Sequence, residues 1–106
     1  MKRGEVRWYT FKAPDKRRPV LILTRDTAIG FLNALTVAPI TSTVREIPSE
    51  LYLDEDDGLL NPCAANFDNI VTIPKTQVGD LITTLPLTKM LDAERAIQFA
   101  LGFSQL

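Results

Sequence analysis

Cationic and hydroxyl side chains occur at the ends of two apolar stretches, and their types suit the binding of anionic oxygens. The cations directly precede an aliphatic run, and the hydroxyls directly follow a second apolar run. In chain order they are Lys16, Arg17 and Arg18 before residues 19–24, and Thr41 and Ser42 after residues 35–40. An arginine at the mouth of a rigid strand is held in place, and its planar guanidinium donates paired hydrogen bonds to oxyanions. If both stretches are strands of one sheet, we expect Arg18 and Thr41 to face the same cleft.

Hydrophobic patterning predicts the strands that position these side chains. The continuous aliphatic run indicates a strand that is buried on both faces, and Pro39 indicates a sheet edge or a bulge. Residues 12–18 are expected to form a hairpin loop, and residues 25–33 a short helical turn or a loop. The acidic residues 54–57 are expected in a turn with Gly58 at positive φ. The predicted strands are residues 5–11, 19–24, 35–40 and 50–53, residues 62–67 with 69–73 as one strand interrupted near Asp68, and residues 80–84.

The apolar period changes near the C-terminus and predicts a helix there. Pro86 suits its start and Gly102 its end. The residues expected on its apolar face are Leu87, Met90, Leu91, Ile97, Ala100 and Leu101. Short strands joined by short turns, followed by one helix, predict a mainly β (α+β) fold, an SH3-like antiparallel barrel with a C-terminal helix. At this length we expect residues 1–106 to form a single domain.

The charge of the chain is strongly polarised, although its formal net charge is only -1. Residues 1–26 contain eight Lys and Arg against three acids, and residues 43–69 contain one Arg against seven acids. Such a chain can present a basic groove to a phosphate backbone despite its acidic balance. The alternative is a solvated basic loop and a solvated acidic turn.

The residue types that are missing exclude several kinds of chemistry. The chain has no histidine and one cysteine, which excludes an intramolecular disulfide, histidine acid–base catalysis and a zinc site, so we expect no metal or other cofactor. Cys63 is expected to be a small buried hydrophobe. The acidic turn lacks the ligand spacing of a calcium-binding EF-hand loop. No apolar segment is long enough for a membrane span and no signal-peptide block is present, so we expect a cytoplasmic protein without membrane contact.

Four motifs, in order and at matching spacing, resemble the MazF/PemK/Kid family of type II toxins, the mRNA interferases. The likeness extends over essentially the whole chain. The motifs are residues 2–8 (KRGEVRW) with 17–23 (RRPVLIL), residues 37–42 (VAPITS), residues 68–75 (DNIVTIPK) and the C-terminal helix.

The resemblance implies a homodimeric, metal-independent, sequence-specific endoribonuclease that is neutralised by a MazE-like antitoxin. It assigns catalysis to Arg18, which precedes the proline of the second strand, and to Thr41, which follows the Ala-Pro-Ile strand. The single-stranded RNA substrate supplies its own nucleophile, the 2′-OH, so the enzyme has only to assist proton transfer and stabilise charge on phosphorus. Arginine is a poor base at its usual pKa, which favours an electrostatic role. The expected products are a 2′,3′-cyclic phosphate and a 5′-hydroxyl.

Other residues near these motifs are predicted to bind the substrate. Lys16, Arg17 and Ser42 are candidates for phosphate contacts. Asn66 and Asp68 stand where related toxins carry an arginine and an aspartate, and both can hydrogen-bond a base edge. Their alternative is turn formation, which Asn and Asp favour. The aromatic residues of the first strand either stack on bases or belong to the core.

Two other functions fit the same fold. CcdB-like toxins bind gyrase and use a tryptophan near the C-terminus, whereas this chain ends Gly-Phe-Ser-Gln-Leu. A non-catalytic SH3-like binding module would use Arg17 and Arg18 only as a basic rim. If the family resemblance holds, the acidic tail of the antitoxin is expected to cover residues 12–18 and compete with RNA.

Overall fold

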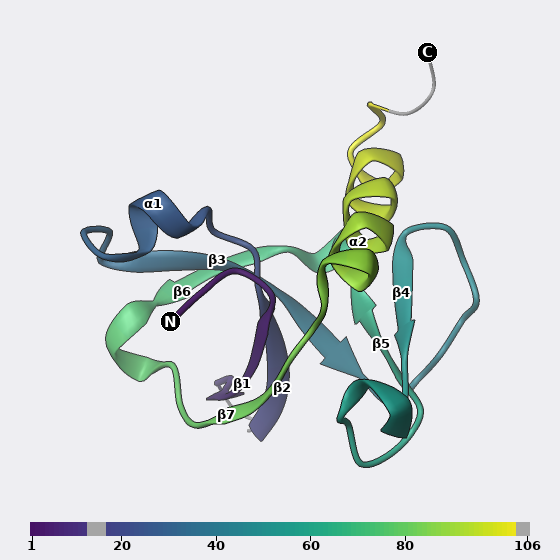
Figure 1. The fold of residues 1–106 in the computed structure, drawn as a ribbon, viewed down its shortest axis with the longest axis horizontal. Coiled ribbons are helices and arrows are strands. Elements are labelled where there is room, and N and C mark those ends of the chain that lie inside the picture. The colour runs from purple at the N-terminus through teal and green to yellow at the C-terminus, as the bar shows by residue number, and fades with distance from the viewer. Residues whose placement is uncertain (13–16, 104–106) are drawn as a thin grey trace.

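A curled antiparallel sheet dominates the computed structural model, which describes residues 1–12 and 17–103 (Figure 1). Its strands are β1 (Glu5–Thr10), β2 (Arg17–Ile22), β3 (Ala34–Thr41), β4 (Glu50–Leu53), β5 (Cys63–Asn66), β6 (Val71–Pro74) and β7 (Leu81–Thr84). The helices are α1 (Asp26–Ile29) and α2 (Leu87–Ala100), with 3₁₀ turns η1 (Glu55–Asp57), η2 (Phe67–Asn69) and η3 (Lys75–Gln77). Among the described residues, no helix is long and apolar enough to cross a membrane.

The strands follow the order β4-β5-β3-β2-β1-β7, and β6 pairs with β3 as well. The first half of β3 pairs with β6 and its last two residues pair with β5, so β3 joins the two parts of the sheet. α2 packs against β4 and η2 and stands beside β4 and β5 (Figure 1). This curled half-barrel with a C-terminal helix confirms the predicted fold class.

Pro39 lies where β3 changes partners. The Thr36 carbonyl accepts a hydrogen bond from the Leu23 N–H, so Thr36 faces the β2 side of the sheet. Backbone direction alternates along a strand, and Pro39 therefore faces the other side. On that side, the pairing of β3 with β6 stops at Val37 and its pairing with β5 starts at Ile40. The missing N–H of proline thus falls at a break in the ladder, as predicted for this position.

The two faces of β2 bury side chains in different cores, as its continuous aliphatic sequence predicts. Leu21 packs with Val6 and Ala38 in the core under α2. Val20 and Ile22 pack on the opposite face, and all three side chains of β2 are fully buried. β2 is therefore a rigid base for the residues that precede it.

The hairpin loop between β1 and β2 is shorter than predicted. Arg17 and Arg18 were expected in the loop, but they are the first residues of β2 and pair with Thr10 and Tyr9 of β1. Cross-strand pairing, which is not visible in the local composition, extends the strand beyond its aliphatic run. Lys16 lies outside the described residues.

The predicted apolar face of α2 is partly wrong. The buried residues of the helix are Ala93 and Ala96, with Met90, Ile97 and Ala100 partly buried against the core. Small side chains let the helix approach the sheet closely, which leaves Leu87, Leu91 and Leu101 exposed. The end of the helix is as predicted, because Gly102 has φ +83° and follows the last turn.

Other turn predictions are confirmed. Gly58 has φ +96°, and an added Cβ would clash with the Thr83 side chain. η2 interrupts the strand near Asp68 and separates β5 from β6. Residues 26–29 form a short helix.

Candidate active site

Arg18 lies in a shallow hollow on one side of the β2–β3 pair. It is half-buried and shares a space of about 270 Å³ with Phe11, Pro39, Asn69 and Val71, here called the Arg18 hollow. The strand pairing to Tyr9 fixes its backbone. The guanidinium therefore extends from a fixed backbone position into the hollow, which suits an electrostatic role there.

Thr41 and Ser42 line a second hollow of about 200 Å³, here called the Trp8 hollow. Its walls are apolar side chains from β1, β2 and β7 and from the segment after η1. Its lining residues are Trp8, Pro19, Ile40, Thr41, Ser42, Leu59, Leu60, Asn61, Pro62, Cys63 and Ile82. The Thr41 hydroxyl oxygen accepts a hydrogen bond of 3.2 Å from the Thr43 N–H. Its own hydrogen is thus left to donate to a substrate oxygen.

The β2–β3 register brings Arg18 and Thr41 to the same end of the two strands. Val20 pairs with Pro39 in this antiparallel pair. Arg18 lies two positions before Val20 and Thr41 lies two positions after Pro39, so both fall at the same end. They line two different hollows rather than the single cleft that was expected. Consecutive side chains of a strand point to opposite faces, so Arg18 and Pro39 mark the hollow on one face of the strand pair, and Pro19 and Ile40 mark the hollow on the other face.

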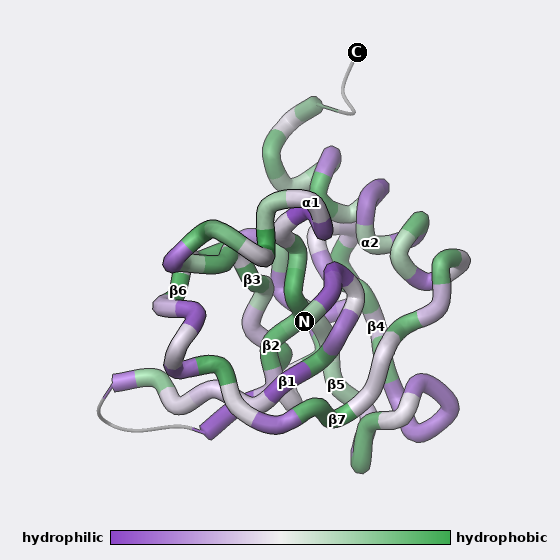
Figure 2. The backbone as a smooth tube through the Cα atoms, turned by 60° about the vertical axis from the view of Figure 1, so that its left-hand side comes forward, coloured by the Kyte–Doolittle hydropathy of each residue, from purple (hydrophilic) through white to green (hydrophobic). Residues whose placement is uncertain are grey.

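Arg17 lies against an aromatic ring. Its guanidinium carbon lies 4.1 Å from the centroid of the Trp8 ring, a cation–π contact. Trp8 and Phe11 are half-buried and line the two hollows. The aromatic side chains of Trp8 and Phe11 thus contribute to the surface of the candidate site. The chain is hydrophilic on both sides of the undescribed residues 13–16 (Figure 2).

Asn66 and Asp68 make turn contacts, which was the alternative to base recognition. The Asn66 amide oxygen accepts a hydrogen bond of 2.9 Å from the Asp68 N–H and caps η2. Asn66 is only 6% exposed. Asp68 Oδ2 accepts a hydrogen bond of 2.6 Å from the Ser49 hydroxyl, although the residue itself is exposed. Their substrate contacts remain predictions.

Two asparagines on the hollows were not predicted. Asn69 lines the Arg18 hollow and Asn61 lines the Trp8 hollow, and both residues are exposed. Asn69 belongs to the third family-like motif, so its position next to Asp68 was a usable signal. Asn61 lies in a Leu-Leu-Asn-Pro stretch outside the motifs, and only the packing of that stretch near Trp8 reveals it.

The titratable groups around the Trp8 hollow are few. Burial raises the pKa of the Cys63 thiol above its ordinary value of 9.0, and the charges of Asp57 and Asp54 raise it further. The thiol is therefore protonated at neutral pH and forms an apolar wall. Among residues 1–12 and 17–103, no three His, Cys, Asp or Glu residues are grouped as metal ligands.

Comparisons with known proteins agree with the resemblance in the sequence. The model of the PemK-like, MazF-like toxins of type II toxin–antitoxin systems matches residues 2–101. The endoribonuclease MazF3 of Mycobacterium tuberculosis is 42% identical over 88 residues, which cover 83% of this chain and 82% of that protein.

Two solved structures have the same fold. The M. tuberculosis toxin MazF-mt6 superposes with a TM-score of 0.85 at 36% identity, covering 92% of this chain and 96% of that one. An endoribonuclease from a mycobacterial species, solved in complex with its cognate antitoxin, superposes with a TM-score of 0.86 at 25% identity. That match covers 96% of this chain and 95% of the other.

Proposed function

The chain belongs to the PemK-like, MazF-like toxins of type II toxin–antitoxin systems and is an endoribonuclease of that family; we propose that it cleaves single-stranded RNA at specific sequences without a metal ion. The proposal rests chiefly on the β2–β3 register, which brings an arginine and a threonine to one end of the strand pair. Both groups suit a reaction that develops negative charge on phosphate oxygens.

In the proposed reaction the 2′-OH of the RNA attacks the adjacent phosphorus. The new O2′–P bond forms as the P–O5′ bond breaks, the 2′-OH loses its proton and the leaving 5′-oxygen gains one. Arg18 donates hydrogen bonds to the non-bridging oxygens and stabilises the charge that builds up on them. The Thr41 hydroxyl orients one of these oxygens or assists the proton that reaches O5′. The products are a 2′,3′-cyclic phosphate and a 5′-hydroxyl.

The other candidate residues have supporting roles in this proposal. Arg17, Lys16 and Ser42 contact flanking phosphates, which position the strand without reading its sequence. Asp68, which is exposed, is placed to contact a base edge, whereas Asn66 acts mainly by holding η2 in shape.

The proposed partners follow from the family and from the exposed surface. A MazE-like antitoxin neutralises the enzyme, since a mycobacterial relative was solved with its cognate antitoxin. A second copy of the chain covers the exposed apolar side chains of α2, among them Leu87 and Leu91, to form a homodimer. The cytoplasm, where RNA is present, is the proposed location.

The decisive test is cleavage in the presence of EDTA. Purified protein is incubated with a long end-labelled single-stranded RNA pool, next to an Arg18→Ala variant and a DNA strand of the same sequence. We expect discrete RNA fragments with cyclic phosphate ends, intact DNA, and at least roughly 100-fold slower cleavage by the variant. If RNA stays intact in the presence of folded wild-type protein, the proposed RNA cleavage is wrong and a toxin that acts by binding a protein is favoured.

A further inference from the structure

The Trp8 hollow is suited to an uncharged planar group rather than to a phosphate. Most of its lining is apolar, and no arginine or lysine among the described residues lines it. Arg18 lines the other hollow instead. A phosphate would find its cation in the Arg18 hollow, whereas a group in the Trp8 hollow would meet an indole ring and aliphatic walls. Unpaired RNA bases are held in this way, by stacking on aromatic rings.

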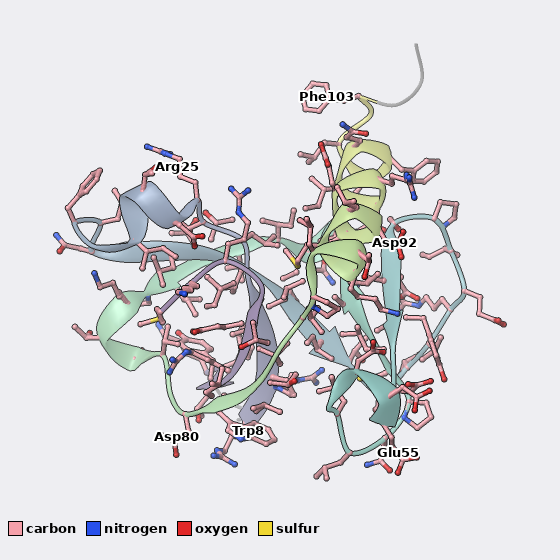
Figure 3. The ribbon with its side chains drawn as sticks, viewed as in Figure 1. Trp8, Arg25, Glu55, Asp80, Asp92 and Phe103 are labelled. Atoms are coloured by element: carbon pink, nitrogen blue, oxygen red, sulfur yellow. The ribbon has the colours of Figure 1, made fainter. Side chains whose placement is uncertain are left out.

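The backbone of Trp8 is held in place before any ligand binds, and Arg17 packs against its ring. Its backbone N–H donates to the Asp80 carbonyl at 3.1 Å, and its carbonyl accepts from the Gly79 N–H at 2.8 Å. Arg17 lies over the ring at 4.1 Å without lining the hollow. Figure 3 shows Trp8 and Asp80 at the same end of the molecule as Glu55 of η1, with Phe103 at the opposite end. An aromatic platform fixed in this way loses little freedom when a base stacks on it.

Polar groups in the lining can read the edge of a stacked base. The Asn61 amide offers a donor and an acceptor side by side, which is the pattern needed to pair with a base edge. Asn61 is exposed, and its side chain has no hydrogen bond to another described residue. Thr41 lines the same hollow, so a base held there belongs to a nucleotide next to the scissile phosphate.

We infer that the Trp8 hollow binds one unpaired nucleobase of the RNA, stacked on Trp8 and read at its edge by Asn61. Arg17 acts as a positioning residue that keeps the ring in its orientation. The inference rests on the proposed function for the nature of the ligand, and it assigns part of the sequence preference to two residues outside the catalytic pair.

Fluorescence provides a direct test, because Trp8 is the single tryptophan of the chain. The probe is the RNA sequence that the wild-type protein cleaves, made with 2′-O-methyl groups so that the nucleophile is blocked. We expect a saturable change in Trp8 fluorescence. Trp8→Leu should weaken binding, measured by anisotropy, about tenfold or more, whereas Trp8→Phe should retain most of it. Phe31→Leu, at another exposed aromatic residue, is the matched control and should bind normally.

The edge-reading role has its own readout. Asn61→Ala should relax the sequence preference at one position of the cleavage site, measured by sequencing the fragments of a random RNA pool. Asn33→Ala, at an exposed turn, should leave the preference unchanged. Both variants are compared with the wild-type protein by thermal unfolding to confirm that they are folded.

The results separate the failure of this inference from the failure of the proposed function. If the wild-type protein cleaves RNA and the folded Trp8→Phe, Trp8→Leu and Asn61→Ala variants bind and cut with wild-type affinity and preference, the inference is overturned and the function stands. If RNA stays intact, the function fails. In that case a fluorescence response of Trp8 to the single-stranded RNA pool itself would still support a base site. No response, or a response only to an apolar peptide, would overturn it.

Discussion

The two ends of the β2–β3 strand pair use their polar groups in opposite ways. At the closed end, near Thr24 and Thr36, the chain hydrogen-bonds to itself. The Thr36 N–H donates to Thr24 Oγ1 at 2.7 Å, and Lys75 Nζ donates to the Ile29 carbonyl at 2.5 Å. At the open end, near Arg17, Arg18 and Ser42, no side-chain hydrogen bond joins these three residues to another described residue.

This difference separates residues that stabilise the fold from residues that act on a ligand. A buried polar group with a partner in the chain costs free energy when that partner is lost. A charged group without such a partner contributes little to stability and keeps its hydrogen bonds for a substrate. We therefore expect changes at the open end to reduce activity without unfolding the protein, and changes at the closed end to do the reverse.

The largest effect is expected for Arg18→Lys. Lysine keeps the charge but lacks the planar pair of donors, so kcat should fall roughly 100-fold while the melting temperature stays within about 2 °C. The matched variant Arg17→Lys should lose less than about tenfold, since Arg17 is assigned only flanking contacts. Single-turnover cleavage of one defined RNA measures both. Equal losses would contradict the assignment of catalysis to Arg18.

A smaller loss is expected for Thr41→Val, which removes the hydroxyl and keeps the shape. One weakened transition-state hydrogen bond corresponds to roughly a tenfold fall in kcat. KM should change little, because the contact acts on the reacting phosphate. Ser42→Ala is the neighbouring control, with a loss of about threefold or less. A Thr41→Val enzyme as fast as the wild type would remove the hydroxyl from the mechanism.

At the closed end, Thr24→Val should destabilise the protein and spare catalysis. Thr24 is 9% exposed, and its loss leaves the Thr36 N–H without its partner. The free energy of unfolding should fall by about 1–2 kcal/mol, and the melting temperature by about 5–10 °C. Thr84→Val, at an exposed strand residue, should change little. A folded Thr24→Val protein with much slower cleavage would show that the two ends are not independent.

The sequence predicted the site strands well because their signals are local. The aliphatic run after Arg18 is typical of a strand buried on both faces. Arg18 and Thr41 were identified by family-like motifs, and the β2–β3 register then brought them to one end.

The parts that were not predicted depend on contacts between distant segments. Which side of α2 faces the core depends on how closely the sheet accepts a helix, so Ala93 and Ala96 are buried while Leu87 and Leu91 are exposed. The Trp8 hollow exists because residues 59–63 pack near β1 and β7, far away in sequence. Residue types alone also do not say whether Asn66 caps a turn or reads a base.

The smallest effect is expected for Glu5→Gln. This change removes the charged partner of Arg7, the third arginine of the β1–β2 hairpin, and tests whether Arg7 stays outside the site. Arg7 Nε donates to Glu5 Oε1 at 2.8 Å and Arg7 also bonds the Gly79 carbonyl, so its charge is held within the fold. Burial alone would raise the pKa of Glu5. The hydrogen bond from Arg7, a hydrogen bond from the Lys2 backbone, and the charges of Arg7 and the N-terminus together outweigh burial and hold that pKa below its ordinary value of 4.5.

A carboxylate whose pKa is lowered on folding stabilises the protein above its unfolded pKa, and this contribution is lost as the pH falls through the folded pKa. At neutral pH the wild type should therefore be more stable than Glu5→Gln by less than about 1 kcal/mol. The difference should shrink below pH 4.5, measured by urea unfolding across the acid range, and cleavage should be unchanged at neutral pH. A loss of cleavage in this variant would instead connect Arg7 to the open end.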